Sequence, residues 1–309
     1  EKRFPAIFPV LARHTPPLRI YIFRPHQHQP TLPALFSRHM FLLLVAFVFC
    51  ASQSLALSPA VLVTGANKGI GKAIVKAIVQ TKPDVHVFLG SRDLSRGEAA
   101  VKDISSSRVS VLALDVGDLA SVEAAAKEVT ESGFALTAIC NNAGVGFGLG
   151  FEETLNVNFW GTKRVCDAFV PLLGPSSRVV NIASASGPNF VAKLPSDADK
   201  SFWSSSETSW EELESRITAT TPMLDYDNSA YGFSKACVNV YTQQLAASRP
   251  DLVINSCTPG WIATDLTKGM GASNPPEKGT LAPMKLLFGE LPESARGHYF
   301  GSDGLRSPL

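Results

Sequence analysis

The sequence contains a tyrosine and a lysine four residues apart, Tyr231 and Lys235, whose side chains can do proton chemistry together. On a helix this spacing puts both side chains on one face, so they approach the same site. A free phenol has a pKa of about 10, and a neighbouring ammonium lowers that pKa because it stabilises the phenolate. The pair therefore predicts general acid chemistry with Tyr231 as the proton donor. The alternative interpretation is that Tyr231 is a packed helix aromatic and Lys235 a solvated charge, neither with a chemical role.

A glycine-rich turn supplies a second chemical signal. The run Thr64-Gly65-Ala66-Asn67-Lys68-Gly69-Ile70-Gly71 stands between a short apolar run and a helical stretch. Glycines let the backbone turn tightly and approach a pyrophosphate, and the N-terminus of the next helix offers unpaired N–H groups and the positive end of its dipole. The turn therefore predicts nucleotide binding rather than a purely structural role. The residues expected to take part are Gly65, Asn67, Lys68, Gly69, Ile70 and Gly71.

The elements that must position these residues alternate from residue 59 onward. Apolar runs typical of buried strands cover residues 60–64, 85–89, 109–114, 136–140, 178–182 and 252–256. Helical periodicity covers residues 70–79, 97–104, 119–131, 153–173 and 230–247. This rhythm predicts an α/β fold, a doubly wound Rossmann-type parallel sheet with helices on both faces, in a single domain over residues 59–309. Ligands bind such sheets at the carboxyl ends of the strands, so the chemistry is expected there.

Further motifs follow the glycine turn in order along these elements. They are Asn141-Asn142-Ala143-Gly144, the segment at Asn158, Asn181-Ile182-Ala183-Ser184, Tyr231 to Lys235, and Pro259-Gly260-Trp261. Alone, a tyrosine and a lysine at this spacing are weak support for any family, because chance produces them often. Together with the TGxxxGxG spacing of the turn, the ordered set resembles the short-chain dehydrogenase/reductase family over about residues 59–305.

The resemblance implies a role for each matching residue. Tyr231 gives its proton to a substrate carbonyl oxygen, Ser184 hydrogen-bonds that oxygen, Lys235 also binds the nicotinamide ribose, and Asn158 holds a water in the proton relay. A second group is implied to border the cofactor: Asp115, Val116, Asn142, Ala143, Gly144, Pro259, Gly260, Trp261, Ile262 and Thr264. A plain residue at a helix N-terminus is the other interpretation of Asp115. About fourteen residues lead from Gly144 to Asn158, fewer than the family usually has, so this segment is trimmed.

The residues after the second predicted strand indicate which cofactor is preferred. An acidic residue there accepts from the ribose 2′-hydroxyl of NAD, whereas an arginine accommodates the 2′-phosphate of NADP. Here Ser91 stands at the acid position and Arg92 follows it. Lys68 is a second cation within reach, and Asp93 is expected to point outward or to pair with Arg92 or Arg96. The sequence therefore predicts NADP(H).

The distance between two expected catalytic residues indicates the branch of the family. Ser184 and Tyr231 are 47 positions apart, which leaves room for an insert over about residues 188–228. Within it, Ser209 and Glu212 have the spacing of a helix capping box. An insert at this place resembles the monomeric NADPH-dependent carbonyl reductases, where it covers the helix face that other members use to dimerise. The resemblance implies a monomer acting on quinones, aldehydes and ketones, with Trp261 lining the substrate pocket; ordinary core packing is the alternative for Trp261.

Residues 1–58 are a different kind of sequence. Residues 1–39 hold six Lys or Arg, one acidic residue and seven prolines, so no packed element is predicted there. Residues 41–57 contain a signal-like apolar segment, too short to span a bilayer, through which alone a membrane association is expected. A targeting or anchor role and a disordered leader both stay open. The protein is expected in the cytoplasm if residues 1–58 are leader sequence, and in the secretory pathway or at the ER otherwise.

Composition narrows the classes of function. The net charge of +1 argues against a nucleic-acid partner, and the 45% hydrophobic fraction provides for one sizeable core. The five cysteines have no CxxC spacing and stand mostly in apolar runs, which favours buried thiols over disulfides or a metal site. A narrow-specificity alcohol, steroid or pigment dehydrogenase is the nearest alternative function. A non-catalytic NADP(H)-sensing protein is the alternative from another class.

Overall fold

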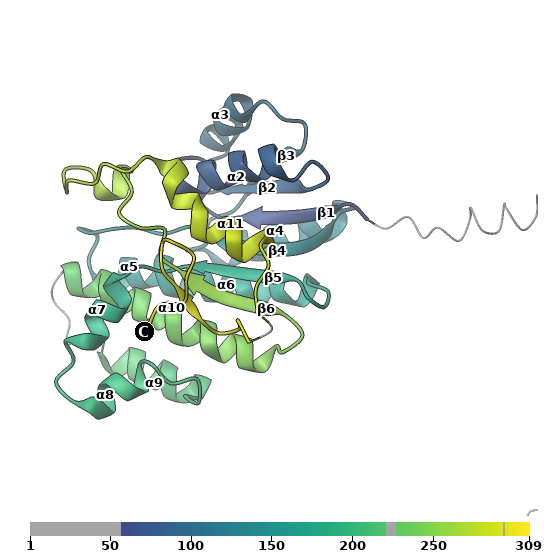
Figure 1. Ribbon diagram of the computed structural model, residues 1–309. Coiled ribbons are helices and arrows are strands. Elements are labelled where there is room, and N and C mark those ends of the chain that lie inside the picture. The colour runs from purple at the N-terminus through teal and green to yellow at the C-terminus, as the bar shows by residue number, and fades with distance from the viewer. Residues whose placement is uncertain (1–56, 221–226, 293) are drawn as a thin grey trace, which may run out of the picture. The chain divides into compact units, whose positions relative to one another are not determined.

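A parallel β-sheet forms the centre of the protein (Figure 1). The computed structural model describes residues 57–220, 227–292 and 294–309. In this part of the chain the strands are β1 (Pro59–Val63), β2 (His86–Ser91), β3 (Val109–Ala113), β4 (Ala135–Asn141), β5 (Arg178–Ile182), β6 (Val253–Cys257) and β7 (Tyr299–Phe300). They pair in the order β3-β2-β1-β4-β5-β6-β7, and each pairing is parallel. The predicted doubly wound sheet is confirmed.

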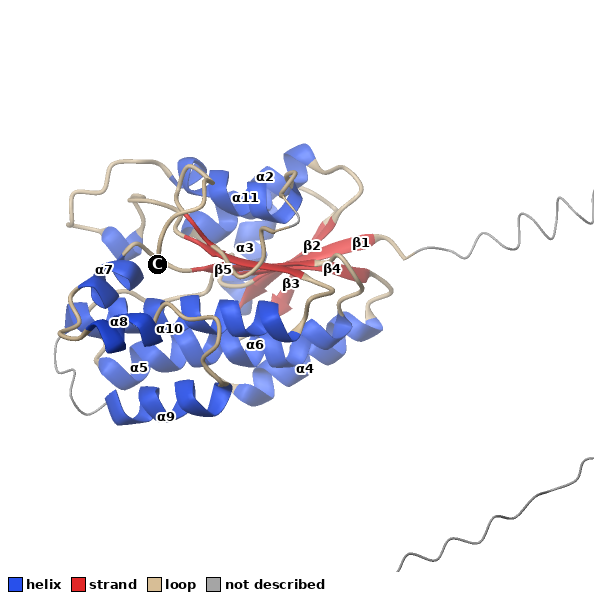
Figure 2. Cartoon of the chain, turned by 60° about the horizontal axis from the view of Figure 1, so that its bottom comes forward, coloured by secondary structure: helices blue, strands red, loops and turns tan. Residues whose placement is uncertain are grey.

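Helices cover both faces of the sheet, which is seen edge-on in Figure 2. On one face lie α2 (Gly69–Thr81), α3 (Leu94–Ile104) and α11 (Leu281–Phe288). On the other face lie α4 (Leu119–Glu131), α6 (Gly161–Phe169) and α10 (Asp227–Ser248). This layering is that of a doubly wound α/β domain, and it leaves the carboxyl ends of the central strands open at one edge.

Strand β1 shows why the strands of this sheet appear in the sequence as unbroken apolar runs. Ala60 and Leu62 point into the core on one face, and Val61 and Val63 point into the core on the other. All four side chains are fully buried. A parallel strand covered by helices on both sides has no solvent face, so its residues do not alternate between apolar and polar.

The stretch predicted as one helix over residues 153–173 is broken into pieces. It consists of α5 (Phe151–Leu155), a π-helical turn η1 (Asn156–Trp160), α6 and a 3₁₀ turn η2 (Val170–Leu172). A π turn widens the helix by one residue and rotates the side chains that it carries relative to the next helix. Asn158 lies in the middle of this turn.

Helix α10 is buried on every side from Ala230 to Thr242. Each residue from Ala230 to Thr242 is buried, which is the pattern of a helix with no solvent-facing stripe. It packs against β6 and against α7 (Ser186–Ala192). It also packs against α5, the π turn and α9 of the insert predicted from the long spacing between Ser184 and Tyr231.

Within the described part of that insert, α8 (Asp197–Phe202) and α9 (Trp210–Thr220) lie on the α10 side of the sheet. The predicted capping box starts α9, because the Ser209 N–H donates to Glu212 Oε2 at 2.9 Å and the Glu212 N–H donates to Ser209 Oγ at 3.2 Å. Trp210 packs edge-to-face on Trp160 and on Tyr241 of α10, with ring centroids 6.0 and 6.3 Å apart. The insert therefore covers the apolar face of α10 with its own side chains.

Two expectations concern residues outside this description. The leader over residues 1–58 and its signal-like segment 41–57 lie outside the described residues except for Leu57 and Ser58, and the insert's residues 221–226 lie outside them too. Within the residues that are described, none of the helices combines the length and the apolar character that crossing a membrane requires.

Candidate active site

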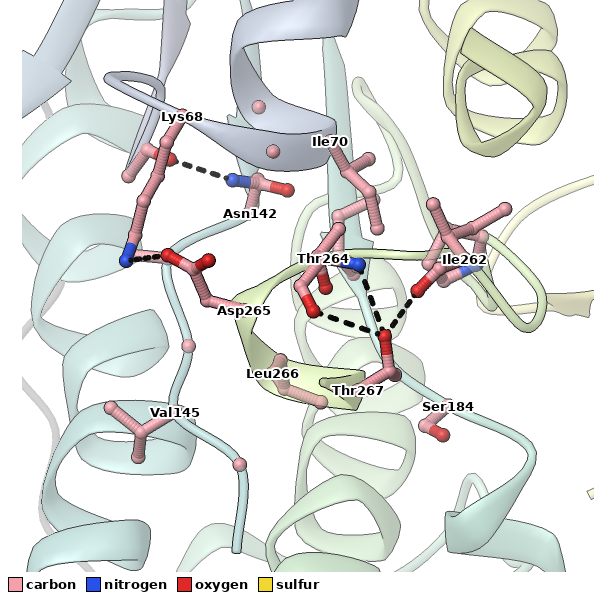
Figure 3. A pocket seen from close by; sticks show the side chains of 18 of the residues that line it. Lys68, Ile70, Asn142, Val145, Ser184, Ile262, Thr264, Asp265, Leu266 and Thr267 are labelled. Atoms are coloured by element: carbon pink, nitrogen blue, oxygen red, sulfur yellow. Dashed lines mark hydrogen bonds and ion pairs between the residues drawn. The ribbon is translucent and has the colours of Figure 1, made fainter. Parts of the chain in front are cut away.

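The carboxyl ends of the central strands open into a cleft of about 720 Å³. Figure 3 shows part of it, with Lys68 and Asn142 at one wall and Thr264 and Ser184 at the other. The lining includes these residues expected from the sequence: Gly65, Asn67, Lys68, Gly69, Ile70, Gly71, Arg92, Asp115, Val116, Asn142, Ala143, Gly144, Ser184, Tyr231, Lys235, Pro259, Gly260, Trp261, Ile262 and Thr264. Of the expected site residues, Asn158 alone does not line the cleft and is fully buried behind it. Motifs far apart in sequence thus meet in one place.

The glycine turn is braced by the turn after β4. The Thr64 hydroxyl accepts hydrogen bonds from the main-chain N–H groups of Asn142 at 3.0 Å and Ala143 at 2.9 Å. In return, the Asn142 side-chain amide donates to the carbonyls of Thr64 at 2.9 Å and Gly65 at 3.1 Å. These four bonds lock the ends of neighbouring strands together and hold the turn open toward the cleft.

Two positions in the turn have room for glycine only. Gly65 has a φ of +61°, and a Cβ there would lie 2.8 Å from the Cα of Ala143. A Cβ on Gly71 would lie 2.4 Å from the Asn142 amide nitrogen. Helix α2 begins at Gly69, within the glycine-rich run, with no side-chain cap and no acidic residue in its first turn. Its first N–H groups and dipole are therefore free to hold an anionic group of a ligand.

Tyr231 and Lys235 lie at the floor of the cleft, one helical turn apart on α10. Tyr231 is 8% exposed, and burial raises the pKa of its phenol, while a hydrogen bond with the Ser184 side chain acts in the opposite direction. The Lys235 ammonium donates to the main-chain oxygen of Ile182 at 2.9 Å. Burial lowers the pKa of Lys235 to about 8. At neutral pH the site thus holds a protonated phenol beside a cation.

Ser184 stands at the end of β5 and is oriented by its own local turn. Its Oγ accepts a hydrogen bond from the Ser186 main-chain N–H at 3.2 Å and lies 3.3 Å from Ser186 Oγ. Both serines line the cleft. The Ser186 main chain thus orients the Ser184 side chain at the cleft.

Asn158 holds the segment that follows Gly144 through hydrogen bonds to the main chain of Val145. Its Oδ1 accepts from the Val145 N–H at 2.8 Å, and its Nδ2 donates to the Val145 carbonyl at 3.1 Å and to Ser234 Oγ at 3.1 Å. A Cβ on Gly144 would lie 3.1 Å from Asn158 Oδ1. The π turn therefore presents Asn158 directly to the backbone that follows the fourth strand. Its implied part in a proton relay stays a prediction.

The two charged residues that follow β2, Arg92 and Asp93, differ in their partners. Asp93 caps α3: its Oδ1 accepts from the Arg96 N–H at 3.0 Å and its Oδ2 from Arg96 Nε at 2.7 Å. These bonds, with one from Ser95, lower the pKa of Asp93 to about 2. Arg92 is exposed on the cleft wall, and its guanidinium has no ion pair with any residue that the structure describes. A cation is thus left for a ligand while the neighbouring acid is neutralised by Arg96.

The lining of the cleft also contains residues that the sequence motifs did not reveal. Phe147 packs on the ring of Tyr231, with centroids 5.0 Å apart. Leu149 and Leu266 line the cleft too. Trp261, which was predicted to line it, does so and is 47% exposed, so it is not an ordinary core residue. The only sequence signal for the first two is the run of alternate glycines at 144, 146, 148 and 150, between which they stand.

The four cysteines that the structure describes do not line this cleft. Cys140, Cys166, Cys237 and Cys257 are buried, and burial raises the pKa of Cys140 and of Cys166 to about 12. Cys257, although it stands just before Pro259, belongs to the core. Among the described residues there is no cluster of three or more side chains that could hold a metal ion.

This arrangement defines a class of protein. A glycine turn at the carboxyl edge of a doubly wound sheet, leading to a buried tyrosine and lysine, is the arrangement of a dinucleotide-binding α/β protein.

Comparisons with known proteins give the family. A family model described as short chain dehydrogenase matches residues 59–196. Carbonyl reductase [NADPH] 1 of Sus scrofa is 33% identical over 261 residues, covering 76% of this chain and 88% of that protein. The Homo sapiens protein of the same name is 32% identical and is covered to 92%. The chain belongs to the short-chain dehydrogenase/reductase family and is similar to its carbonyl reductases.

Solved structures agree with this assignment. Menthone neomenthol reductase from Mentha piperita superposes with a TM-score of 0.66 at 27% identity, covering 80% of this chain and all of that one. Salutaridine reductase from Papaver somniferum has a TM-score of 0.68 at 24% identity over 78% of this chain and 98% of that one, which supports the fold alone.

Proposed function

We propose that this protein reduces the carbonyl groups of small molecules to alcohols with NADPH, and that Tyr231 is the proton donor. The observation that carries the proposal is that Ser184, Tyr231 and Lys235 line the same cleft as the glycine turn, with Tyr231 and Lys235 one helical turn apart on α10. Carbonyl reductases similar to this chain are named for NADPH.

The residues of the cleft fit this cofactor. The close packing of Gly65 on Ala143 and of Gly71 on Asn142 keeps the glycine turn tight, and the first N–H groups of α2 beside it are free to bind a pyrophosphate. Arg92 offers an uncommitted guanidinium for the 2′-phosphate, and guanidinium binds phosphate strongly because it can donate two parallel hydrogen bonds. Asp115, on the adenine side, has its Oδ1 engaged by the Gly117 N–H at 2.9 Å.

The chemistry follows from the protonation states at the floor of the cleft. When bound there, NADPH supplies the hydride. The Tyr231 O–H donates its proton to the substrate oxygen, and the Ser184 hydroxyl donates a hydrogen bond to the same oxygen as negative charge develops on it. The Lys235 ammonium stabilises the phenolate that Tyr231 becomes, because opposite charges attract strongly in a buried site.

The shape of the substrate side supports apolar carbonyl compounds such as quinones, aromatic aldehydes and ketones. Phe147, Leu149 and Leu266 give the wall an apolar surface, and Trp261 offers a broad ring at the entrance. We also propose that the protein is a monomer, since the insert covers the outer face of α10 with Trp210 and its neighbours.

The test is oxidation of NADPH and NADH by the full chain in the presence of a quinone, an aromatic aldehyde and a steroid ketone, beside the variant Tyr231→Phe. We expect turnover with NADPH that falls at least about 100-fold in the variant, because proton transfer by a positioned side chain is worth that much or more. Turnover of the steroid ketone alone would favour a narrow-specificity dehydrogenase. Tight NADPH binding without turnover of any compound would favour a sensor, and preference for NADH would contradict the role given to Arg92.

A further inference from the structure

We infer that Phe147 determines substrate specificity, and that its ring favours a carbonyl group attached to a flat aromatic ring over the same group on a saturated ring. The Phe147 side chain lines the cleft, and its ring packs on that of Tyr231 with centroids 5.0 Å apart and an angle of 51° between the two planes. The inference rests on the proposed function, in which a substrate oxygen accepts the proton of Tyr231.

The contact between the two rings brings a substrate beside Phe147. The hydroxyl that gives the proton belongs to the ring on which Phe147 packs. Tyr231 is only 8% exposed, so little of this side chain is open to a ligand. Phe147 is half-buried and lines the same cleft as Tyr231 and Ser184. A molecule whose oxygen reaches the Tyr231 and Ser184 hydroxyls therefore lies in contact range of the Phe147 ring.

The backbone that carries Phe147 is held from two sides. The Asn158 side chain accepts from the Val145 N–H at 2.8 Å and donates to the Val145 carbonyl at 3.1 Å. Gly146 packs on Leu266, in the segment after β6, so closely that a Cβ on Gly146 would lie 2.8 Å from Leu266 Cγ. The chain is thus fixed directly before Phe147, and the ring has a defined place in the cleft.

The residues after Phe147 leave the space around them open. Gly148 and Gly150 have φ values of +89° and +76°, a conformation that favours glycine, and a Cβ on either would meet nothing within 4 Å. Leu149, which stands between them, is 43% exposed. The segment therefore presents Phe147 to Tyr231, whereas Leu149 is more exposed to solvent.

An aromatic side chain at this place discriminates between flat and puckered rings. Aromatic rings prefer offset-stacked or edge-to-face contacts with one another, and such a contact changes an equilibrium or rate constant by about two- to tenfold beyond the effect of buried area. A saturated ring has no π-face with which to form it. The Phe147 ring thus gives an aromatic carbonyl compound an advantage that its saturated counterpart does not share.

The experiment compares benzaldehyde with cyclohexanecarbaldehyde, which carry the same aldehyde group on a flat and on a puckered ring. We measure kcat/KM with NADPH for the full chain as wild type, Phe147→Leu and Phe147→Tyr. Dividing the benzaldehyde-to-cyclohexanecarbaldehyde ratio of a variant by that of wild type cancels the intrinsic reactivity of the two aldehydes. We expect the ratio to fall about two- to tenfold in Phe147→Leu, because leucine is apolar without an aromatic face, and to be preserved in Phe147→Tyr. The KM for NADPH should be unchanged in both variants.

Phe151→Leu is the matched control. Phe151 is also half-buried and stands at the far end of the glycine run, and its ring centroid lies 5.5 Å from that of Phe233 on α10. It does not line the cleft. This variant removes an aromatic contact between the same segment and the same helix, so its ratio should equal that of wild type.

The remaining outcomes separate failure of the inference from failure of the proposed function. If Phe147→Leu changes kcat/KM for both aldehydes by the same factor, or for neither, Phe147 does not select the substrate and the inference is overturned. An equal fall of the ratio in Phe151→Leu would overturn it too, because looser packing on α10 would then be the cause. Turnover of a quinone but of neither aldehyde by wild type would also contradict the selectivity. If wild type reduces none of these three compounds with NADPH, the proposed function itself fails.

Discussion

The Lys235 ammonium lies 5.7 Å from the centre of the Tyr231 ring and gives its described hydrogen bond to the main-chain oxygen of Ile182 rather than to the phenol. Lys235 therefore acts on Tyr231 through its charge. That charge is costly to hold, because the side chain is only 4% exposed. The folded protein thus keeps a destabilising charge at the place where the proposed proton transfer requires it, at a cost in stability.

Replacing Lys235 with methionine should stabilise the protein and abolish its activity. The pKa of Lys235 falls from 10.5 to about 8 on folding, which corresponds to about 3 kcal/mol of cost to the folded state at pH 7. Loss of the hydrogen bond to Ile182 offsets part of this, so we expect a gain of about 2 kcal/mol in the free energy of unfolding.

The gain should depend on pH. Below pH 8 the lysine is charged in both the folded and the unfolded state, so the full cost applies. As pH rises from 8 toward 10.5 the folded state loses this proton first, and the cost fades. Urea unfolding of wild type and Lys235→Met at pH 7 and pH 9.5 measures the difference. A gain that is the same at both values would show that packing, not charge, is responsible.

Replacing Arg92 with alanine should change the cofactor preference. Removal of a charged hydrogen-bonding partner of the 2′-phosphate should weaken NADPH binding by about 10-fold or more and leave NADH binding unchanged. Fluorescence titration with both nucleotides measures this. Arg96→Ala is the control, because Arg96 is engaged by Asp93, and equal losses for NADPH in the two variants would disprove the assignment.

Replacing Asn158 with alanine should loosen the segment that borders the catalytic residues. Both main-chain groups of Val145 would lose buried partners, which should cost about 2–4 kcal/mol of stability. Hydrogen exchange should speed up at the Val145 amide in particular. Asn156→Ala, in the same π turn but bonded to Arg164, is the control. Unaltered exchange at Val145 would mean that the segment is held in place by other contacts.

Replacing Leu213 with alanine tests the part played by the insert. Leu213 is fully buried in α9, so the cavity should cost about 2–5 kcal/mol. The loosened helix should also uncover the apolar face of α10 and promote association at high concentration, seen by light scattering. Leu305→Ala, at a position 61% exposed, should change stability by less than about 0.5 kcal/mol. A wild type that is already dimeric would contradict the proposed monomer.

Much of this fold could be predicted from the sequence, for a local reason. A parallel strand buried on both faces shows an unbroken apolar run, so β1 to β6 were predictable to within a residue or two at most of their ends. The glycine turn and Asn142 were predictable as well, since tight turns demand particular residues. Strand β7 was not, because two residues paired only with the end of β6 leave no pattern.

The site was less predictable where it depends on contacts between distant segments. Hydrophobic spacing is nearly the same in an α-helix and a π turn, so the break at Asn156–Trp160 left no sign in the sequence. Phe147 meets Tyr231 only because α10 passes beneath the trimmed segment. Likewise, Lys68 Nζ lies 2.6 Å from Asp265 Oδ2, and nothing local to Lys68 indicates this partner, because only the parallel sheet brings the two turns to the same edge.

The depth at which the thiols are buried has a further consequence. Quinones and unsaturated aldehydes are electrophiles that alkylate thiolates, and a thiol reacts only as far as it ionises and is accessible. The four cysteines in the described part of the chain are buried and have raised pKa values. The proposed turnover of such compounds would therefore leave these four thiols unmodified.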